Sequence, residues 1–131
     1  MLQFHKEQDQ QERDPNGMEA HTPGAKLDEG KVRIDLIFDG FPNALKAVAE
    51  VATFGAQKYS ENGWQMVPNG VKRYTAAMDR HRIEEGVGHD FDSETGYRHA
   101  AHLAWNALAR LELMIREDIY EDPYDAESAQ A

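Results

Sequence analysis

The sequence has no cysteine, so it can form neither a disulfide framework nor a zinc site built from thiolates. No stretch of it approaches the roughly 18 consecutive apolar residues that a transmembrane helix requires. Its first residues, MLQFHKEQDQQERD, contain no hydrophobic signal segment. We therefore expect a protein that does not enter a membrane and that works in the cytoplasm. Its 131 residues are enough for one domain with a single core.

Basic residues are also scarce, because 14 Lys and Arg stand against 24 Asp and Glu, which gives a formal net charge of -10. The imbalance lies in the ends: residues 1–24 carry -3 and residues 117–131 carry -6, whereas residues 25–116 carry only -1. Both ends are polar and lack apolar periodicity, which predicts a flexible N-terminal arm over residues 1–24 and a flexible acidic tail from residue 118. From the nearly neutral domain between them, residues 25–117, we expect no direct nucleic-acid binding.

Three segments have the pattern of helices. The first, PNALKAVAEVATFGAQKY (42–59), starts with proline and is rich in alanine. The second, VKRYTAAMDRHRIEE (71–85), stops shortly before two glycines. The third contains RHAAHLAWNALARLELM (98–114), and Asp92 or Ser93 is its expected N-cap. The segment between the first two helices is rich in turn-forming residues and predicts a loop.

The stretch KVRIDLIFDGF (31–41) fits either a short strand or an extended arm or turn packed on a helical bundle. The prediction for the whole chain is an all-α fold. Three helices in so short a core leave much apolar surface exposed, and a small bundle usually closes with a fourth helix. We therefore expect a homo-oligomer, a dimer or tetramer, in which helices from two or more chains complete the core.

Polar side chains lie where the predicted helices should meet. Successive residues advance about 100° around a helix, which places two histidines and an asparagine of the third helix along the border of its apolar face. On the second helix a histidine lies within the apolar arc, with glutamates at its edges. The residues of this seam are His81, Glu84, Glu85, His99, His102 and Asn106, with Glu50 on the first helix.

Each of these residues also has a purely structural interpretation. A histidine beside an apolar stripe is more often a hydrogen-bonded structural residue than a ligand. Glu50 could simply pair with Lys46 one turn earlier, and Asp92 to Glu94 could be only a helix cap. Their number is the argument for a site, because bundle cores are where carboxylate and imidazole metal sites are built. Oxygen donors suit Mg²⁺ or Mn²⁺, and the imidazoles shift the preference toward Mn²⁺.

A phosphate substrate would require cations besides the metal, and the same helices supply them. Lys58 ends the first helix and Lys31 lies in the preceding arm, so both could reach over a cleft. Trp64, in a loop with glycine, could stack on a base, although a loop tryptophan is more commonly a packing anchor. The full set of nearby cations is Lys26, Lys31, Lys58, Lys72, Arg73, Arg80, Arg82 and Arg98.

Four stretches, in order, resemble a known family: GAKLDEGKVRIDLI, AEVATFGAQKYSENGW, RYTAAMDRHR and DFDSETGYRHAAHLAWNAL. Together they cover about residues 24–116 and resemble the phage dATP/dGTP diphosphohydrolases, all-α relatives of MazG. Within that family the likeness is greatest to the MazZ group of phages that replace adenine with 2-aminoadenine. The motifs are specific as an ordered set and weak singly.

The resemblance implies a reaction and a cofactor. Members hydrolyse a purine deoxynucleoside triphosphate, dGTP or dATP, to the monophosphate and pyrophosphate with a divalent metal, Mg²⁺ or Mn²⁺. The implied mechanism is in-line attack of a metal-activated water on the α-phosphorus. In the MazZ group the reaction would convert dGTP to dGMP, the precursor of the modified nucleotide, in the host cytoplasm.

The resemblance also implies roles for residues. The substrate-binding set is Lys31, Lys58, Tyr59, Trp64 and Arg80, to which the seam argument adds Asn106. The metal set is Glu50, His81, Asp92, Glu94 and His99, together with Glu84, and the catalytic set is Glu50, His81 and His102.

The chain departs from the pattern of MazG relatives at three places. They carry E-x-x-E on one helix and E-x-x-D on the next, whereas this chain reads Glu50 to Thr53 and His81 to Glu84. His89 also stands where relatives tend to have glutamate. The number of metals and the ligand list therefore stay open.

Two features of the sequence suggest other functions. The dipeptide His89-Asp90 suggests an HD-type phosphohydrolase, which would release triphosphate or phosphate. However, His81 is only eight residues upstream, so the two histidines would not come from well separated helices. The acidic ends fit a non-enzymatic interaction protein, but the neutral, histidine-rich centre does not.

Overall fold

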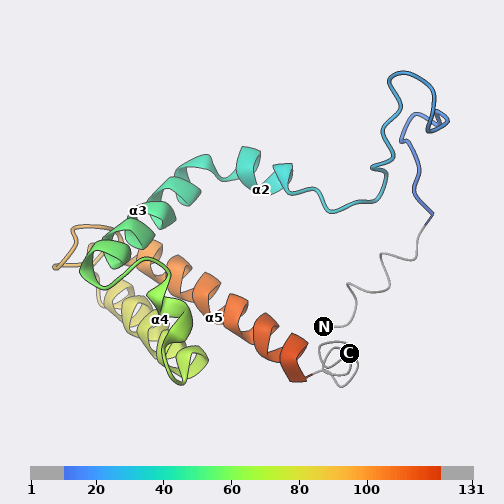
Figure 1. Ribbon diagram of the computed structural model, residues 1–131. Helices are drawn as coiled ribbons and strands as arrows, with labels where there is room; N and C mark the ends of the chain where they lie inside the picture. Colours follow the sequence, from blue (N-terminus) through green and yellow to red (C-terminus); the bar gives the residue numbers. More distant parts are fainter. Residues whose placement is uncertain (1–10, 122–131) are drawn as a thin grey trace. The chain divides into compact units, whose positions relative to one another are not determined.

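The computed structural model describes residues 11–121, and the chain divides into two compact units, residues 1–40 and 41–131. The expected all-α class is confirmed, because residues 11–121 contain helices and no named strand (Figure 1). None of these helices is both long and apolar enough to cross a membrane. Much of the expected flexible arm and tail falls on residues 1–10 and 122–131, which lie outside the described part.

The N-terminal unit contains a closed loop organised around one carboxylate. Asp14 is buried and accepts hydrogen bonds from the backbone N–H groups of Lys26 and Asn16, each at 2.7 Å. The Lys26 bond is the largest cause of the lowered pKa of Asp14. The N–H of Glu29 donates to the carbonyl of Arg13 and closes the loop. The polar composition of residues 1–24 predicted a flexible arm and did not indicate this local order.

The stretch expected to be a strand or an extended segment contains a short helix, α2 (Asp35–Gly40). The strand alternative is therefore wrong for these residues. Arg33 lies just before the helix and makes two hydrogen bonds to the Asp35 carboxylate, at 3.0 and 2.7 Å. This negative charge lies in the first turn of the helix, where it is favourable. A short apolar run fits helix or strand equally well, so local contacts decided the outcome.

The C-terminal unit is built from α3 (Pro42–Lys58), α4 (Gly70–Gly86) and α5 (His99–Glu121). A 3-10 turn, η1 (Gly63–Met66), lies in the loop after α3. The limits of α3 and α4 agree with the expected helices to within one residue. Helices α4 and α5 run antiparallel as a closely packed pair, and α3 packs against α5 (Figure 1).

A glycine allows α4 to approach α5 closely at its first residue. Gly70 is buried, and a Cβ atom there would lie 2.6 Å from Cδ1 of Leu113 on α5. Asn69, just before it, has a left-handed backbone with φ 55°, a conformation that asparagine tolerates better than most residues. The start of α4 is therefore fixed by its contact with α5.

The expected N-cap of the third helix is wrong. Helix α5 begins at His99, several residues after Asp92 and Ser93. The Asp92 carboxylate instead accepts the N–H and O–H of Thr95, both at 2.9 Å, which stabilises a turn before the helix. Aspartate side chains bind nearby backbone N–H groups in turns as readily as in helix caps, so the sequence could not distinguish the two.

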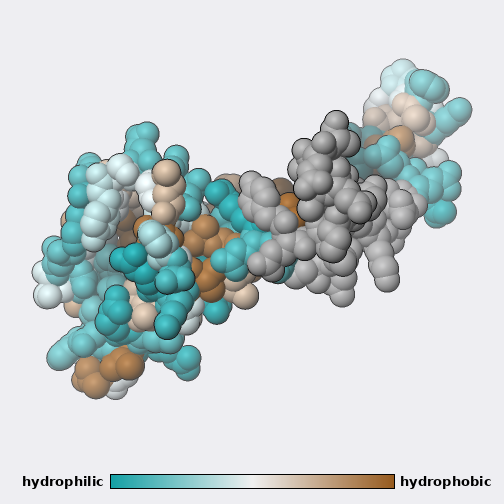
Figure 2. Space-filling view, turned by 60° about the horizontal axis from the view of Figure 1, so that its bottom comes forward, coloured by the Kyte–Doolittle hydropathy of each residue, from teal (hydrophilic) through white to brown (hydrophobic). Residues whose placement is uncertain are grey.

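Burial in the C-terminal unit is unusual. Its buried apolar residues in the described part are the small side chains Val51, Ala101 and Ala109, whereas the buried polar ones are His99, His102 and Asn106. Apolar residues reach the surface among hydrophilic ones (Figure 2). The unit thus buries polar side chains and leaves large apolar side chains exposed to solvent. The exposed ones on α4 and α5 include Ile83, Leu108, Leu111, Met114 and Ile119.

Candidate functional site

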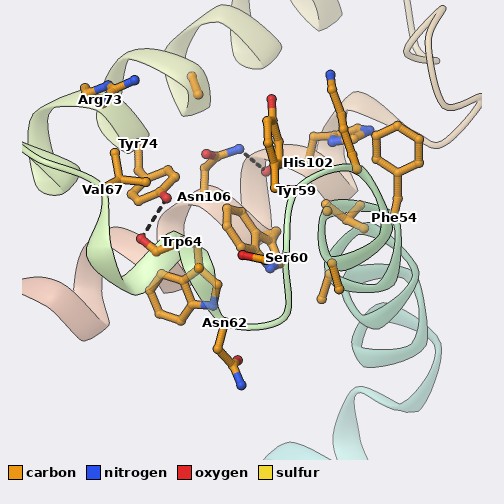
Figure 3. Close-up of a pocket in the computed structure, with 18 of the residues that line it drawn as sticks. Phe54, Tyr59, Ser60, Asn62, Trp64, Val67, Arg73, Tyr74, His102 and Asn106 are labelled. Atoms are coloured by element: carbon orange, nitrogen blue, oxygen red, sulfur yellow. Dashed lines mark hydrogen bonds between the residues drawn. The ribbon is translucent and has the colours of Figure 1, made fainter.

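A pocket of about 810 Å³ lies within the C-terminal unit. Its walls come from the second half of α3, the loop with η1, and the facing sides of α4 and α5. Figure 3 shows Trp64 and Tyr74 on one side and Phe54 on the other, with His102 and Asn106 between them. The volume is within the range of small-molecule sites, so a nucleotide-sized ligand can enter.

Three aromatic rings from three elements form one wall. The ring of Trp105 on α5 lies 5.8 Å from Trp64 and 5.6 Å from Tyr74, in edge-to-face arrangements. The hydroxyl of Tyr74 donates a 2.8 Å hydrogen bond to the Trp64 carbonyl and holds the loop against α4 (Figure 3). Such T-shaped contacts are favourable beyond the area they bury. The wall is therefore mainly aromatic, with its rings at steep angles to one another.

The same pocket is also lined by cationic side chains. They are Arg73 and Arg80 on α4 and Lys58 at the end of α3. The Nζ of Lys58 lies 3.0 Å from both carboxylate oxygens of Glu94, in the loop before α5. This ion pair joins two segments 36 residues apart, and it raises the pKa of Lys58 through the Glu94 hydrogen bond. The pocket thus combines apolar rings with positive charge.

Asn106 places a hydrogen-bond acceptor beside this wall. It is buried, and its Nδ2 donates a 2.8 Å bond to the carbonyl of His102 (Figure 3). Because a carbonyl only accepts, the amide orientation is determined, and Oδ1 is the remaining group. No side-chain polar atom in the described part is both fully buried and unpaired, so Oδ1 is at least partly accessible, and Asn106 lines the pocket.

A cluster of imidazoles lies beside the pocket where α4 meets α5. The Nδ1 atoms of His81 and His99 are 2.8 Å apart, and the ring of His102 is stacked on His81 at 4.6 Å between centroids. Donor atoms of His81, Asp92 and His99 all lie within 4.8 Å of one another. His81 and His102 also line the pocket, so the cluster and the pocket share a wall.

The loop between α4 and α5 brings Asp92 to the histidines. Its two arms are joined by the N–H of Asp92, which donates to the carbonyl of Tyr97 at 2.8 Å. Gly96 turns the chain with φ 74°, a conformation that glycine adopts without strain. The guanidinium of Arg98 lies 5.1 Å above the ring of Phe91. This small hairpin-like turn holds Asp92 and Thr95 at the start of α5.

The surroundings favour the neutral form of His81 and His102 and the charged form of Asp92. Burial is the largest cause that lowers the pKa of both His81 and His102, and each is lowered further by neighbouring histidines. Burial raises the pKa of Asp92, but the two hydrogen bonds from Thr95, and the attraction to His102 and His81 when these are protonated at acidic pH, outweigh it and lower the pKa overall. Neutral imidazole and ionised carboxylate are the forms that bind metal ions.

The donor set of His81, Asp92 and His99 fits a divalent cation. Two nitrogens that bind one ion at about 2.1 Å each, at roughly a right angle, would lie about 3 Å apart. The His81 and His99 nitrogens are already at 2.8 Å. Two imidazoles with one carboxylate are typical of transition-metal sites more than of Mg²⁺ sites, which prefer oxygen throughout.

The structure brings together most of the residues expected from the sequence. All five of the expected substrate-binding residues in this unit line the pocket, and Glu94 and two histidines lie there with them. The pocket residues from the expected sets are Lys58, Tyr59, Trp64, Arg80, His81, Glu94, His102 and Asn106. The expected ligands Asp92 and His99 belong to the adjoining cluster.

Two expected residues of this unit lie elsewhere, and a third belongs to the N-terminal unit. Glu50 is exposed on α3 and is not among the residues that line the pocket. Glu84 pairs with His89 at 2.8 Å instead of with the histidine cluster. Lys31 belongs to the N-terminal unit, where its Nζ lies 3.0 Å from Glu12. Helical spacing places residues on a face but does not determine which face a third helix presents.

The dipeptide His89-Asp90 does not take part in the cluster. Both residues are exposed, and neither lines the pocket. The carbonyl of Asp90 accepts the N–H of His99, so its backbone contributes to the start of α5. The motif that suggested the HD-type alternative therefore has a local structural role here.

Sequence reasoning missed three residues of the site. Tyr74 and Trp105 were not predicted as site residues, although Trp105 is three residues after His102 and so shares its helix face. Thr95 was passed over within the motif DSETG, where the spacing Asp92-x-x-Thr95 is a signal of an aspartate turn. Each signal was present but weak alone.

These features define an all-α protein with a pocket of aromatic and cationic side chains beside a histidine and aspartate cluster. The chain belongs to the family described as dATP/dGTP diphosphohydrolase, N-terminal, whose model matches residues 21–123. It is 40% identical over 81 residues to a dATP/dGTP diphosphohydrolase of Salmonella phage PMBT28. This alignment covers 62% of the chain but only 26% of that relative. No solved structure matches the chain.

Proposed function

We propose that this chain hydrolyses a purine deoxynucleoside triphosphate to the monophosphate and pyrophosphate with a divalent cation. The observation that carries the proposal is the shared wall of His81 and His102, which joins an aromatic, cationic pocket to the cluster of His81, Asp92 and His99, whose donor atoms lie close enough together to hold a metal ion. The printed name of the phage relative, a dATP/dGTP diphosphohydrolase, supports the same substrate class.

The base would lie against the aromatic wall. Trp64, Tyr74 and Trp105 present rings at steep angles to one another, so a planar purine can stack on one ring and meet the edge of another. The Oδ1 of Asn106 would accept a hydrogen bond from an N–H or O–H of the nucleoside. These contacts favour a large base over a small one.

The triphosphate would be held by Arg73, Arg80 and Lys58. Arginine binds phosphate through two parallel N–H groups, whereas lysine acts as a point charge. Lys58 is paired with Glu94 when no substrate is bound, so it would exchange a carboxylate for a phosphate. Because half-exposed ion pairs are worth little, this exchange is easy.

His81, Asp92 and His99 would hold the cation, with Glu94 nearby in the sequence, and the donor set favours Mn²⁺ over Mg²⁺. A divalent ion held there would supply charge neutralisation for the triphosphate and a lower pKa for an attacking water. His102, whose pKa is lowered by burial, is neutral at physiological pH and would take the proton from that water. Glu50 is proposed as a ligand only if a second ion binds.

The biological role that fits this reaction is the supply of dGMP from dGTP for 2-aminoadenine nucleotide synthesis, as in the MazZ group, in the cytoplasm of a phage-infected host. The active form would be a homo-oligomer, a dimer or tetramer. The exposed apolar residues of α5 support this, since leucines at positions 108 and 111 are about half exposed in a single chain (52% and 50%).

The test is an incubation with dGTP, dATP, dCTP and dTTP, each with Mn²⁺, Mg²⁺ or EDTA, with products resolved by ion-exchange chromatography. We expect metal-dependent formation of dGMP, and of dAMP to a comparable or smaller extent, together with pyrophosphate. Asp92→Asn should abolish the reaction, and Asp90→Asn, an exposed neighbour, should not. Deoxynucleoside plus triphosphate would identify an HD-type reaction, and no product from any nucleotide would contradict the proposal.

A further inference from the structure

The hydroxyl of Thr95 lies between the carboxylate of Asp92 and the ring of His102. Its Oγ1 is 2.9 Å from Oδ2 of Asp92 and 2.7 Å from Nε2 of His102. The backbone N–H of Tyr97 also donates to it, at 3.1 Å. Asp92 and His102 are 3.7 Å apart, too far for a direct hydrogen bond. The threonine oxygen is therefore the bridge between them.

The hydrogens in this bridge can be assigned without ambiguity. A hydroxyl has one hydrogen to donate and two lone pairs to accept with. The Asp92 carboxylate is ionised and only accepts, so the Thr95 hydrogen must point to it. The threonine oxygen must then accept from both other partners, the Tyr97 N–H and Nε2–H of His102. This holds for either protonation state of the ring, and in the neutral ring it leaves Nδ1 with the lone pair.

That lone pair has no hydrogen-bond partner in the part of the chain that the structure describes. No hydrogen bond to Nδ1 of His102 occurs among residues 11–121, and no polar side-chain atom there is both fully buried and unpaired. His102 lines the pocket. Because Nε2 is occupied by Thr95, Nδ1 is the ring nitrogen of His102 that is left to accept a hydrogen bond from a ligand in the pocket.

We propose that Thr95 is a positioning residue that fixes His102 in the Nε2–H tautomer, so that the basic Nδ1 faces the pocket. The same hydroxyl holds Oδ2 of Asp92 and leaves Oδ1 for the cation. The kinetic consequence rests on the proposed function, because Nδ1 of His102 would take the proton from the attacking water. The tautomer itself is a property of the protein and does not depend on any activity.

The first experiment reads the tautomer of the full chain by ¹⁵N NMR of its histidine rings, at about pH 8, above the ordinary histidine pKa. Comparison with His102→Gln assigns the signals. We expect wild type and Thr95→Ser to have a protonated Nε2 and an unprotonated Nδ1, because serine retains the hydroxyl. Thr95→Val removes the acceptor and should give a mixture of tautomers or the reverse one. Thr53→Val, at a hydroxyl that donates to its own helix, should change nothing.

The second experiment measures steady-state hydrolysis of dGTP. Thr95→Val should lower kcat roughly 10- to 100-fold, the range for residues that orient a functional group, with little change in KM. Thr95→Ser should restore most of kcat, and Thr53→Val should keep all of it. Circular dichroism shows whether each variant remains folded.

Several outcomes would overturn the proposal. It is wrong if wild type has hydrogen on Nδ1 of His102, or if Thr95→Val keeps the single Nε2–H tautomer. A folded Thr95→Ser variant as slow as Thr95→Val would mean that the methyl group, through packing, is what matters. If the tautomers follow the prediction but no nucleotide is hydrolysed, the positioning of His102 stands and the proposed function fails.

Discussion

The two halves of α5 treat polar and apolar side chains differently, since the first half buries polar ones and the second exposes apolar ones. In the first half, His99, His102 and Asn106 are 5%, 8% and 6% exposed, whereas in the second half Leu111 and Ile119 are each 50% exposed. The hydrophobic effect alone would give the reverse arrangement. Burial in the first half is therefore explained by hydrogen bonding and by the site, and the second half has the character of a surface that another chain would cover.

The difference teaches where this fold places stability and where it places chemistry. Buried polar groups cost free energy unless each has a partner, and those of the first half do: His99 binds His81, His102 binds Thr95, and Asn106 binds a backbone carbonyl. The apolar residues of the second half contribute little to a single chain. Four predictions, from the largest effect to the smallest, test this contrast.

The largest effect is expected when buried polar side chains in the first half of α5 and their partners are replaced by apolar ones, as in an ordinary protein core. The double change His81→Leu with His99→Leu replaces both partners of a hydrogen bond, which can be neutral or stabilising. We expect an unchanged or higher Tm, but a loss of metal-dependent turnover greater than the roughly 100-fold typical of residues that only support a ligand. Calorimetry measures the Tm, and the nucleotide assay measures turnover. Isothermal titration with Mn²⁺ measures the affinity for the metal.

The matched control is His89→Leu, an exposed histidine outside the cluster, which should retain metal binding and turnover. If the double variant kept its affinity for Mn²⁺, the histidine cluster would not be the metal site. A fall in Tm of many degrees would instead assign the buried histidines to stability.

The second prediction concerns a charge introduced into the apolar second half of α5. In a homo-oligomer that covers this face, Leu111→Glu would lose the burial of a leucine, about 1.5–3 kcal/mol, and so raise the dissociation constant by roughly 10- to 100-fold. Sedimentation velocity measures the shift. Glu117→Gln, about 120° around the helix, is the control. Monomeric wild-type protein at micromolar concentration would contradict the expectation of an oligomer.

The third prediction concerns the turn that places Asp92 and Thr95 before the first half. Gly96 has φ 74°, so Gly96→Ala should destabilise the protein by about 1–2 kcal/mol, the cost of a left-handed backbone for a residue with a side chain. Gly86→Ala is the control, because a Cβ atom at this helical position meets nothing within 4 Å. It should be neutral or slightly stabilising. Equal denaturation midpoints for the two variants would show that the turn adapts.

The smallest effect is a pH dependence of stability. The pKa values of His81 and His102 are lowered from the ordinary 6.5, so the unfolded chain binds more protons near that pH. Stability should be complete above pH 6.5 and fall as the pH drops below it. Thermal unfolding with a chelator present measures this, and the slope should be smaller in the double leucine variant. A Tm that rises on acidification would contradict the neutral state of the cluster.

Much of the fold could be predicted from local patterns. The limits of α3 and α4 follow from proline, glycine and alanine, and the seam with His81, His102 and Asn106 follows from helical spacing. The start of α5 could not be predicted, because Asp92 can cap a helix or bind Thr95 in a turn, and only the tertiary contacts decide. The helix α2 was missed for the same reason, since a short apolar run fits either structure.

The sequence by itself determined the all-α class, the main helices and the residue types of the site, because periodicity and composition are properties of local chain geometry. Only the tertiary structure decided which of those residues meet. It left Glu50 in solvent, paired Glu84 with His89, and brought Asp92 and Thr95 to His102. The physical reason is that such contacts depend on how helices pack and how a loop turns, and these are fixed by interactions between residues distant in the chain.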